Sequence, residues 1–184
     1  MLPTPIHRDL ESLCRSYPEP ALLLAAVHAA TPAEIEAISR LWLTEGIPAV
    51  VQRAPIHYEH MRSSVAAELK IQERSISIVG SGRLGYSLAP PKFGRGLNQD
   101  SDLDLFIVDK KLFDDCVDAA QRWREDVIAG LAVFKKIPFN NRAKVIESGY
   151  IHPGWIPEKK EYQPIPRIRV AIRTAQRKLK ELGH

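Results

Sequence analysis

Apolar residues recur every three or four positions along much of this 184-residue chain, which is the pattern of helices that bury one face. The segment over residues 31–46 carries a helix start signal, because Thr31 suits an N-cap, Pro32 suits the first turn, and Glu34 completes a capping box. Residues 21–30 are apolar and predict a buried helix that is too short to span a bilayer. The pattern predicts further helices over residues 31–46, 56–70, 111–131, 140–147 and from 165 onward.

The same spacing predicts which side chains face the core. The expected inward residues are Ile35, Ile38, Leu41 and Trp42 in the first of these helices, Ile56, Met61, Val65 and Leu69 in the second, Leu112, Cys116, Ala119, Ala120, Trp123 and Val127 in the third, and Ile165, Ile168, Ile172, Leu179 and Leu182 in the last.

Two short segments alternate between apolar and polar residues, as half-buried strands do. Residues 75–79 predict one strand, which ends at the turn Gly80-Ser81-Gly82-Arg83. Residues 102–108 predict a second strand, in which Asp102 and Asp104 share one face. The other face of this strand is apolar and carries Leu103, Leu105 and Ile107.

Asp102 and Asp104 are energetically unfavourable in a strand. Asp is disfavoured in strands, and two carboxylates on one face repel each other and lose solvation. A divalent cation would remove that cost, because hard ions such as Mg²⁺ and Mn²⁺ take oxygen ligands. Asp102 and Asp104 are therefore a candidate metal site.

The glycine turn offers the complementary chemistry. A turn after a strand exposes backbone N–H groups that can cradle phosphate oxygens. Ser81 adds a hydroxyl donor, and Arg83 could add charge. Taken alone, the turn and the acid pair are each common surface features. In this order along the chain they describe a site for a metal–triphosphate complex.

Residues 75–109, with Gly80-Ser81 after one strand and Asp102-Leu103-Asp104-Leu105 on the next, resemble the polymerase-β-like nucleotidyltransferase superfamily. The run 80–88 also looks like small bacterial stand-alone nucleotidyltransferase-domain proteins. The resemblance implies an α/β (α+β) fold, with a small mixed sheet flanked by helices. It also implies transfer of an NMP from an NTP to an acceptor hydroxyl on RNA, protein or a nucleotide.

In that scheme Asp102 and Asp104 are the catalytic, metal-binding residues, and Gly80, Ser81 and Arg83 bind the nucleotide. The sequence departs from the superfamily pattern in two ways. The spacing from the turn to the acid pair is long, because a Pro- and Gly-rich loop with Lys92 and Arg95 intervenes. A third carboxylate is also not evident, since no Asp or Glu stands between Asp126 and Glu147, which leaves Glu147 as the nearest candidate.

Two other interpretations remain open. The fold could be a catalytically degenerate binding module that holds nucleotide without turnover and acts in a protein or nucleic-acid complex. Alternatively, the motif could have arisen by chance in a structural α/β domain, which would bind neither nucleotide nor metal.

Length predicts a single domain over residues 1–184, with a helical amino-terminal part (1–70), the core motif (75–109) and a basic carboxy-terminal helix (160–184). Cys14 and Cys116 are far apart, which excludes a disulfide scaffold and a cysteine-only zinc site and favours a reducing compartment. No secretory signal pattern is visible, so the expected location is cytoplasmic, with no membrane partner.

Charge is unevenly distributed. Residues 1–134 hold 14 basic and 18 acidic side chains, whereas residues 135–184 hold 12 basic and 4 acidic ones. The basic end suggests an anionic partner, nucleic acid or an acidic protein, contacted by Arg169, Arg173 and Arg177; the alternative is a solvated helix face. Residues 149–157 combine Pro, Gly and two aromatic residues, as either an anchored loop or a surface for base stacking.

Overall fold

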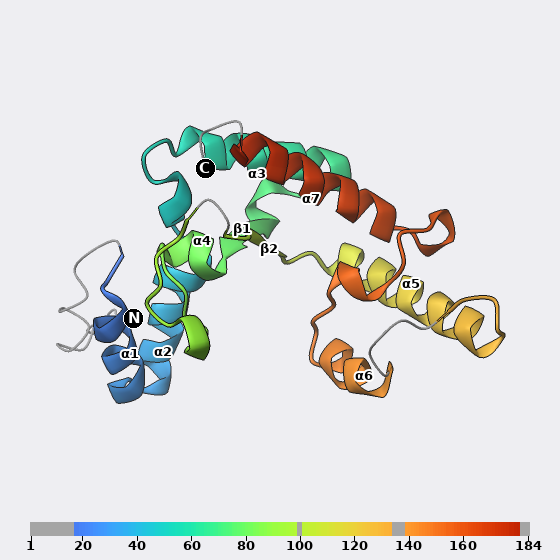
Figure 1. The fold of residues 1–184 in the computed structure, drawn as a ribbon, viewed down its shortest axis with the longest axis horizontal. Coiled ribbons are helices and arrows are strands. Elements are labelled where there is room, and N and C mark those ends of the chain that lie inside the picture. Colours follow the sequence, from blue (N-terminus) through green and yellow to red (C-terminus); the bar gives the residue numbers. More distant parts are fainter. Residues whose placement is uncertain (1–16, 99–100, 134–138, 181–184) are drawn as a thin grey trace, which may run out of the picture. The chain divides into compact units, whose positions relative to one another are not determined.

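The computed structural model describes residues 17–98, 101–133 and 139–180, and it is a helix-rich α+β structure with a two-stranded antiparallel sheet (Figure 1). The chain divides into two compact units. Of the described residues, the first takes in 17–61, 77–98, 101–106 and 179–180, and the second takes in 62–76, 107–133 and 139–178. That the whole chain acts as one domain stays a prediction.

The first unit begins with a helical hairpin, α1 (Pro20–Ala29) and α2 (Pro32–Ile38). The capping box is confirmed, because Thr31 accepts a hydrogen bond from the Glu34 backbone while the Glu34 carboxylate accepts one from the Thr31 N–H at 2.7 Å. Helix α2 continues as the π-helical segment η2 (Ser39–Thr44), which ends before the predicted stop at Gly46.

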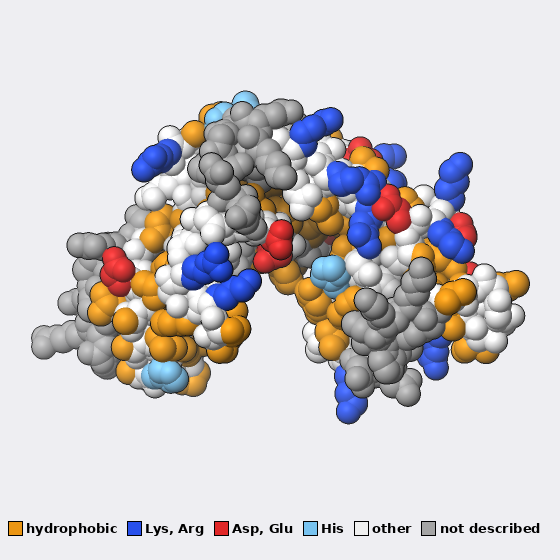
Figure 2. Space-filling view, in the orientation of Figure 1, with side chains coloured by type: hydrophobic (Ala, Val, Ile, Leu, Met, Phe, Trp, Pro, Cys, Tyr) orange, Lys and Arg blue, Asp and Glu red, His pale blue; other side chains and the backbone are white. Residues whose placement is uncertain are grey.

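Burial in this hairpin differs from the expectation. Ile38 and Trp42 are buried, but Ile35 and Leu41 are 36% and 56% exposed. Leu23 is the buried residue of α1, which was expected to be buried as a whole. Apolar side chains therefore lie at the surface over α1 and α2 (Figure 2).

A small hydrophobic cluster holds the hairpin to the segment that follows the first strand. Its buried members come from α1, α2, η2 and residues 84–86, and Ala26 and Ala30 pack against it at the edge. This cluster anchors the candidate phosphate turn to the amino-terminal helices. Its members are Leu23, Ile38, Trp42, Leu84 and Tyr86.

Strand β1 (Ile76–Val79) pairs with β2 (Asp104–Ile107). Ile76 and Ile78 are fully buried, as their alternation predicted. Between the strands lie the one-and-a-half-turn helix α4 (Gly80–Leu84) and the short 3-10 turn η5 (Pro90–Lys92). The short 3-10 segments η3 (Ala49–Val51) and η4 (Glu73–Ser75) flank α3 (Ile56–Leu69) along the chain.

Helix α3 confirms the prediction for residues 56–70, and it buries Met61, Val65 and Leu69. Ile56, expected to face inward, is 57% exposed because it stands at the first position of the helix. No helix among the described residues is both long enough and apolar enough to cross a membrane.

The second unit contains α5 (Lys110–Ile128), α6 (Phe139–Glu147) and residues 165–178 of α7 (Ile165–Lys180), with the 3-10 turns η6 (Pro153–Trp155) and η7 (Lys160–Tyr162) between the last two helices. Helix α5 buries Cys116, Ala119, Ala120 and Trp123, as expected. Burial raises the pKa of the Cys116 thiol to about 12. Cys14 and Leu182 lie outside the described residues.

Candidate functional site

The turn after β1 brings backbone directly against an acidic side chain. Gly80 has a φ of +64°, a conformation that residues with a Cβ avoid. A Cβ built on Gly80 would lie 3.1 Å from Oδ2 of Asp104. The first residue of the turn and the second aspartate of the pair, 24 positions apart in sequence, are thus neighbours.

Gly82 allows a second close approach. A Cβ at this position would lie 2.6 Å from Cδ2 of Leu103 and 3.1 Å from Cγ2 of Ile78. The absence of a side chain therefore lets α4 pack onto the apolar residues beside the acid pair. This role of Gly82 was not predicted from the sequence, in which the Gly-x-Gly spacing is its signal.

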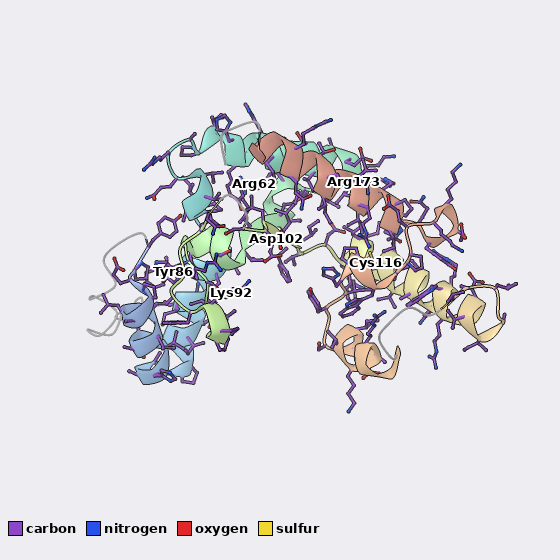
Figure 3. All side chains as sticks on the ribbon, in the orientation of Figure 1. Arg62, Tyr86, Lys92, Asp102, Cys116 and Arg173 are labelled. Carbon is purple, nitrogen blue, oxygen red and sulfur yellow. The ribbon has the colours of Figure 1, made fainter. Side chains whose placement is uncertain are left out.

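The aspartates have the arrangement that the alternating pattern predicts. Asp102 and Asp104 are exposed, while Leu103 and Leu105 between and after them are half-buried. The strand predicted over residues 102–108 is shorter in the structure, because β2 begins at Asp104 and Asp102 precedes it. Figure 3 shows Asp102 next to the sheet and α4. Two carboxylates therefore reach solvent beside the glycine turn, where oxygen ligands suit a hard divalent cation.

A small hydrogen-bonded turn leads into the acid pair. The Asn98 N–H donates to Oγ of Ser101 at 3.0 Å, and the Ser101 N–H donates to the Asn98 carbonyl at the same distance. The Ser101 hydroxyl also lies 3.0 Å from Oδ1 of Asn98. These bonds set the direction in which the chain enters Asp102.

The side chain of Arg83 is buried in the first unit. Its side chain is 2% exposed, and its Nε donates to the carbonyl of Trp42 at 3.2 Å. Burial lowers the pKa of the guanidinium, and the hydroxyls of Tyr58 and Tyr17 partly oppose that shift. The expectation that Arg83 meets the phosphates stays a prediction, and this placement does not favour it.

The loop between α4 and the acid pair is more regular than its Pro and Gly content suggests. Tyr86 and Gly96 form an antiparallel bridge, and the Ser87 and Gly94 N–H groups donate to the Arg95 and Ser87 carbonyls, both at 2.9 Å. The Tyr86 hydroxyl donates to the Pro18 carbonyl at 2.8 Å and fixes the base of the loop. The loop carries Lys92, labelled in Figure 3, as an exposed cation.

The remaining candidates belong to the second unit. Glu147 is exposed at the end of α6, so it stays a third-carboxylate candidate on sequence grounds. On α7, Arg173 and Arg177 are exposed and Arg169 is half-buried. Arg173 makes a two-pronged ion pair with Glu158, with N–O distances of 2.7 and 3.1 Å.

Within the described part of the chain, no group of three or more His, Cys, Asp or Glu side chains is arranged to hold a metal ion. The site built by the first unit thus offers two carboxylates. Comparisons with protein families, with curated proteins and with solved structures found no match to this chain.

The glycine at the turn can be tested by substitution. Gly80→Ala is expected to destabilise the fold by about 1–2 kcal/mol, because of its positive φ. It should also push the Asp104 carboxylate aside and weaken Mn²⁺ binding, since the new Cβ would lie 3.1 Å from Oδ2. Urea unfolding and metal titration would measure the two effects.

Gly130→Ala is the matched control, because Gly130 has a φ of +73° and no atom of the described residues lies within 4 Å of the built Cβ. This variant should lose folding stability because of the positive φ, and its Mn²⁺ binding should be unchanged. Equal metal binding by the two variants would contradict the close approach of Gly80 to Asp104.

Proposed function

We propose that the first unit is a metal-dependent nucleotidyltransferase of the polymerase-β-like type, which transfers an NMP from an NTP to an acceptor hydroxyl. The observation that carries the proposal is the contact between the Gly80-Ser81 turn and the Asp104 carboxylate. It combines an anion-binding turn and a cation-binding acid pair in one site, as a metal–triphosphate substrate requires.

Each residue has a distinct task in this proposal. Backbone N–H groups of Gly80 and Ser81, with the Ser81 hydroxyl, hold the triphosphate. Asp102 and Asp104 would hold Mg²⁺ or Mn²⁺, and the bound ion supplies charge neutralisation at the phosphoryl oxygens. Lys92 and Arg95, both exposed on the bridged loop of the same unit, are available to the outer phosphates.

The chemistry is an in-line displacement at the α-phosphorus. The acceptor oxygen forms a bond to this phosphorus as the bond to the bridging oxygen breaks, and pyrophosphate leaves with that electron pair. The acceptor hydroxyl gives up its proton to solvent water, and the charge of a cation held by Asp102 and Asp104 would make that proton easier to lose. The acceptor is RNA, protein or a second nucleotide.

A second candidate function follows from the number of carboxylates. Asp104 lies against the turn and Asp102 is exposed two residues before it, and two carboxylates suffice to hold one cation with its nucleotide. A binding module of the same fold would use this site to sense or retain an NTP and would release no pyrophosphate.

Incubation with each α-³²P-labelled NTP, Mg²⁺ or Mn²⁺, and total cellular RNA and protein separates the two. A transferase attaches label to one acceptor class, and EDTA abolishes the reaction. A binding module shows no label but a metal-dependent thermal shift with one NTP. Absence of both label and thermal shift would remove both candidates.

A further inference from the structure

The second unit has an aromatic cluster at its surface that the proposed chemistry does not use. It is formed by Tyr150, His152 and Trp155, on and beside the turn η6. The Tyr150 and Trp155 rings meet edge to face, with centroids 5.9 Å apart, and the His152 and Trp155 rings are 6.2 Å apart. Tyr150 is 40% exposed and His152 is exposed, while Trp155 is half-buried.

Arg142 packs against Trp155 and holds this aromatic cluster in place. The guanidinium of Arg142, on α6, lies 5.5 Å from the Trp155 ring centroid and 5.9 Å from that of the buried Trp123. Its Nη1 also donates to the Trp155 carbonyl at 3.1 Å. His152 is fixed as well, because its Nδ1 accepts from the Gly154 N–H at 3.0 Å. Rings fixed in this way lose little entropy when a ligand stacks on them.

A row of arginine side chains on α7 begins beside the aromatic cluster. A Cβ built on Gly154 would lie 3.8 Å from Nη2 of Arg169, which places this guanidinium beside the η6 turn. Arg173 and Arg177 follow at intervals of four residues, so the three arginines share one ridge of α7 with a rise of about 6 Å between neighbours.

The charge around this row favours an anionic ligand. Residues 142–180 contain ten Lys or Arg and three Glu, and α7 itself contains no acidic residue. Figure 2 shows Lys and Arg side chains gathered over α7. Glu158, in the described part of the second unit, forms an ion pair with Arg173. An exposed pair of this kind contributes little stability, so a phosphate can compete for the arginine.

We propose that Tyr150, His152 and Trp155, with the arginine ridge of α7, form a binding surface for single-stranded nucleic acid. Unpaired bases stack on the rings while the sugar–phosphate backbone follows Arg169, Arg173 and Arg177. A duplex is excluded from the stacking contacts, because its base faces are covered by their neighbours. The inference concerns the second unit and stands independently of nucleotidyl transfer.

The test is fluorescence anisotropy of the full chain with labelled oligonucleotides of about 16 nucleotides, as single-stranded RNA, single-stranded DNA and duplex, without NTP or metal. Both single strands should bind more tightly than the duplex, and the stronger of the two identifies the natural ligand. Each phosphate contact should contribute about −0.7 to the slope of log affinity against log salt concentration.

Tyr150→Ala should weaken single-strand binding by about tenfold or more, and Tyr150→Phe should retain it, because stacking needs the ring and not the hydroxyl. Phe93→Ala, at an equally exposed aromatic residue of the first unit (40%), is the control and should bind as the wild type does. Equal affinity of the Tyr150→Ala variant and the wild type would overturn the proposal.

Arg173→Ala with Arg177→Ala should weaken binding and lower the magnitude of the salt slope by about 1.4. Lys110→Ala with Lys111→Ala removes the same charge from exposed residues of α5 and should leave the slope unchanged. Glu158→Gln should tighten binding by about twofold by freeing Arg173. Duplex binding as tight as single-strand binding, or arginine and lysine variants with equal slopes, would overturn the proposal.

The proposed nucleotidyl transfer and the nucleic-acid-binding surface can be refuted by different results. The Asp102→Asn/Asp104→Asn variant should bind oligonucleotide as the wild type does, because its changes lie in the first unit. Nucleotidyl transfer to a protein, with no oligonucleotide bound, would refute the binding surface and leave the proposed function standing.

Discussion

Replacing Asp102 and Asp104 together by Asn is expected to lower nucleotidyl transfer by at least about a thousandfold. Asn is a weak metal ligand without charge, so the variant loses the cation that stabilises the transition state, and a thousandfold corresponds to about 4 kcal/mol. The fold should persist, because both side chains are exposed and Asn has nearly the same shape. Loss of the like-charge repulsion should keep the unfolding midpoint equal or raise it slightly.

The matched control is Asp114→Asn with Asp115→Asn, which makes the same charge change on α5. Those two carboxylates pair with Lys110 and Lys111 at 2.7 Å, so the control should lose a few tenths of a kcal/mol per pair and keep full transfer. Labelled-NTP transfer and urea unfolding measure both variants. Undiminished transfer by the Asp102/Asp104 variant would place the active site elsewhere.

Arg83→Ala is expected to destabilise the first unit by about 2–4 kcal/mol. The side chain is 2% exposed, so truncation leaves a cavity in a packed region and removes the donor to the Trp42 carbonyl. The variant would also lose the side-chain hydrogen bond between Arg83 and Tyr58. The midpoint of urea unfolding, monitored by tryptophan fluorescence, measures the loss.

Arg83→Met separates packing from charge at this position. Met keeps most of the volume and removes a buried cation whose desolvation is costly, so it should recover about half of the lost stability. If Arg83 is purely structural, the Met variant will bind an NTP with the affinity of the wild type. A stable Arg83→Met variant with much weaker NTP binding would instead return Arg83 to the nucleotide site.

The local elements of this protein follow closely from its sequence. The Thr31 capping box, the helix from Ile56, the alternation around Ile76 and the inner face of α5 all occur as the patterns predict. Such features depend on periodicity and on hydrogen bonds between residues a few positions apart, which any window of the sequence contains. The exposed position of Asp102 and Asp104, on either side of the half-buried Leu103, belongs to this class.

The environments of long or polar side chains were decided by tertiary structure. Arg83 is buried because its guanidinium reaches a carbonyl 41 residues earlier in the chain. The loop after α4 becomes regular because Tyr86 pairs with Gly96 and bonds to Pro18. Neither partner can be found from the local pattern, since proximity of distant segments depends on how the elements pack.

The sequence alone therefore determined that a glycine turn follows one strand and that two exposed acids, separated by Leu103, stand at the start of the next. Tertiary structure decided that these halves meet, with Gly80 against the Asp104 carboxylate, because strand pairing of β1 with β2 brings residues 24 apart into contact. It also decided that Tyr150, His152 and Trp155 gather beside Arg169, because packing between α6, the η6 turn and α7 controls which side chains become neighbours.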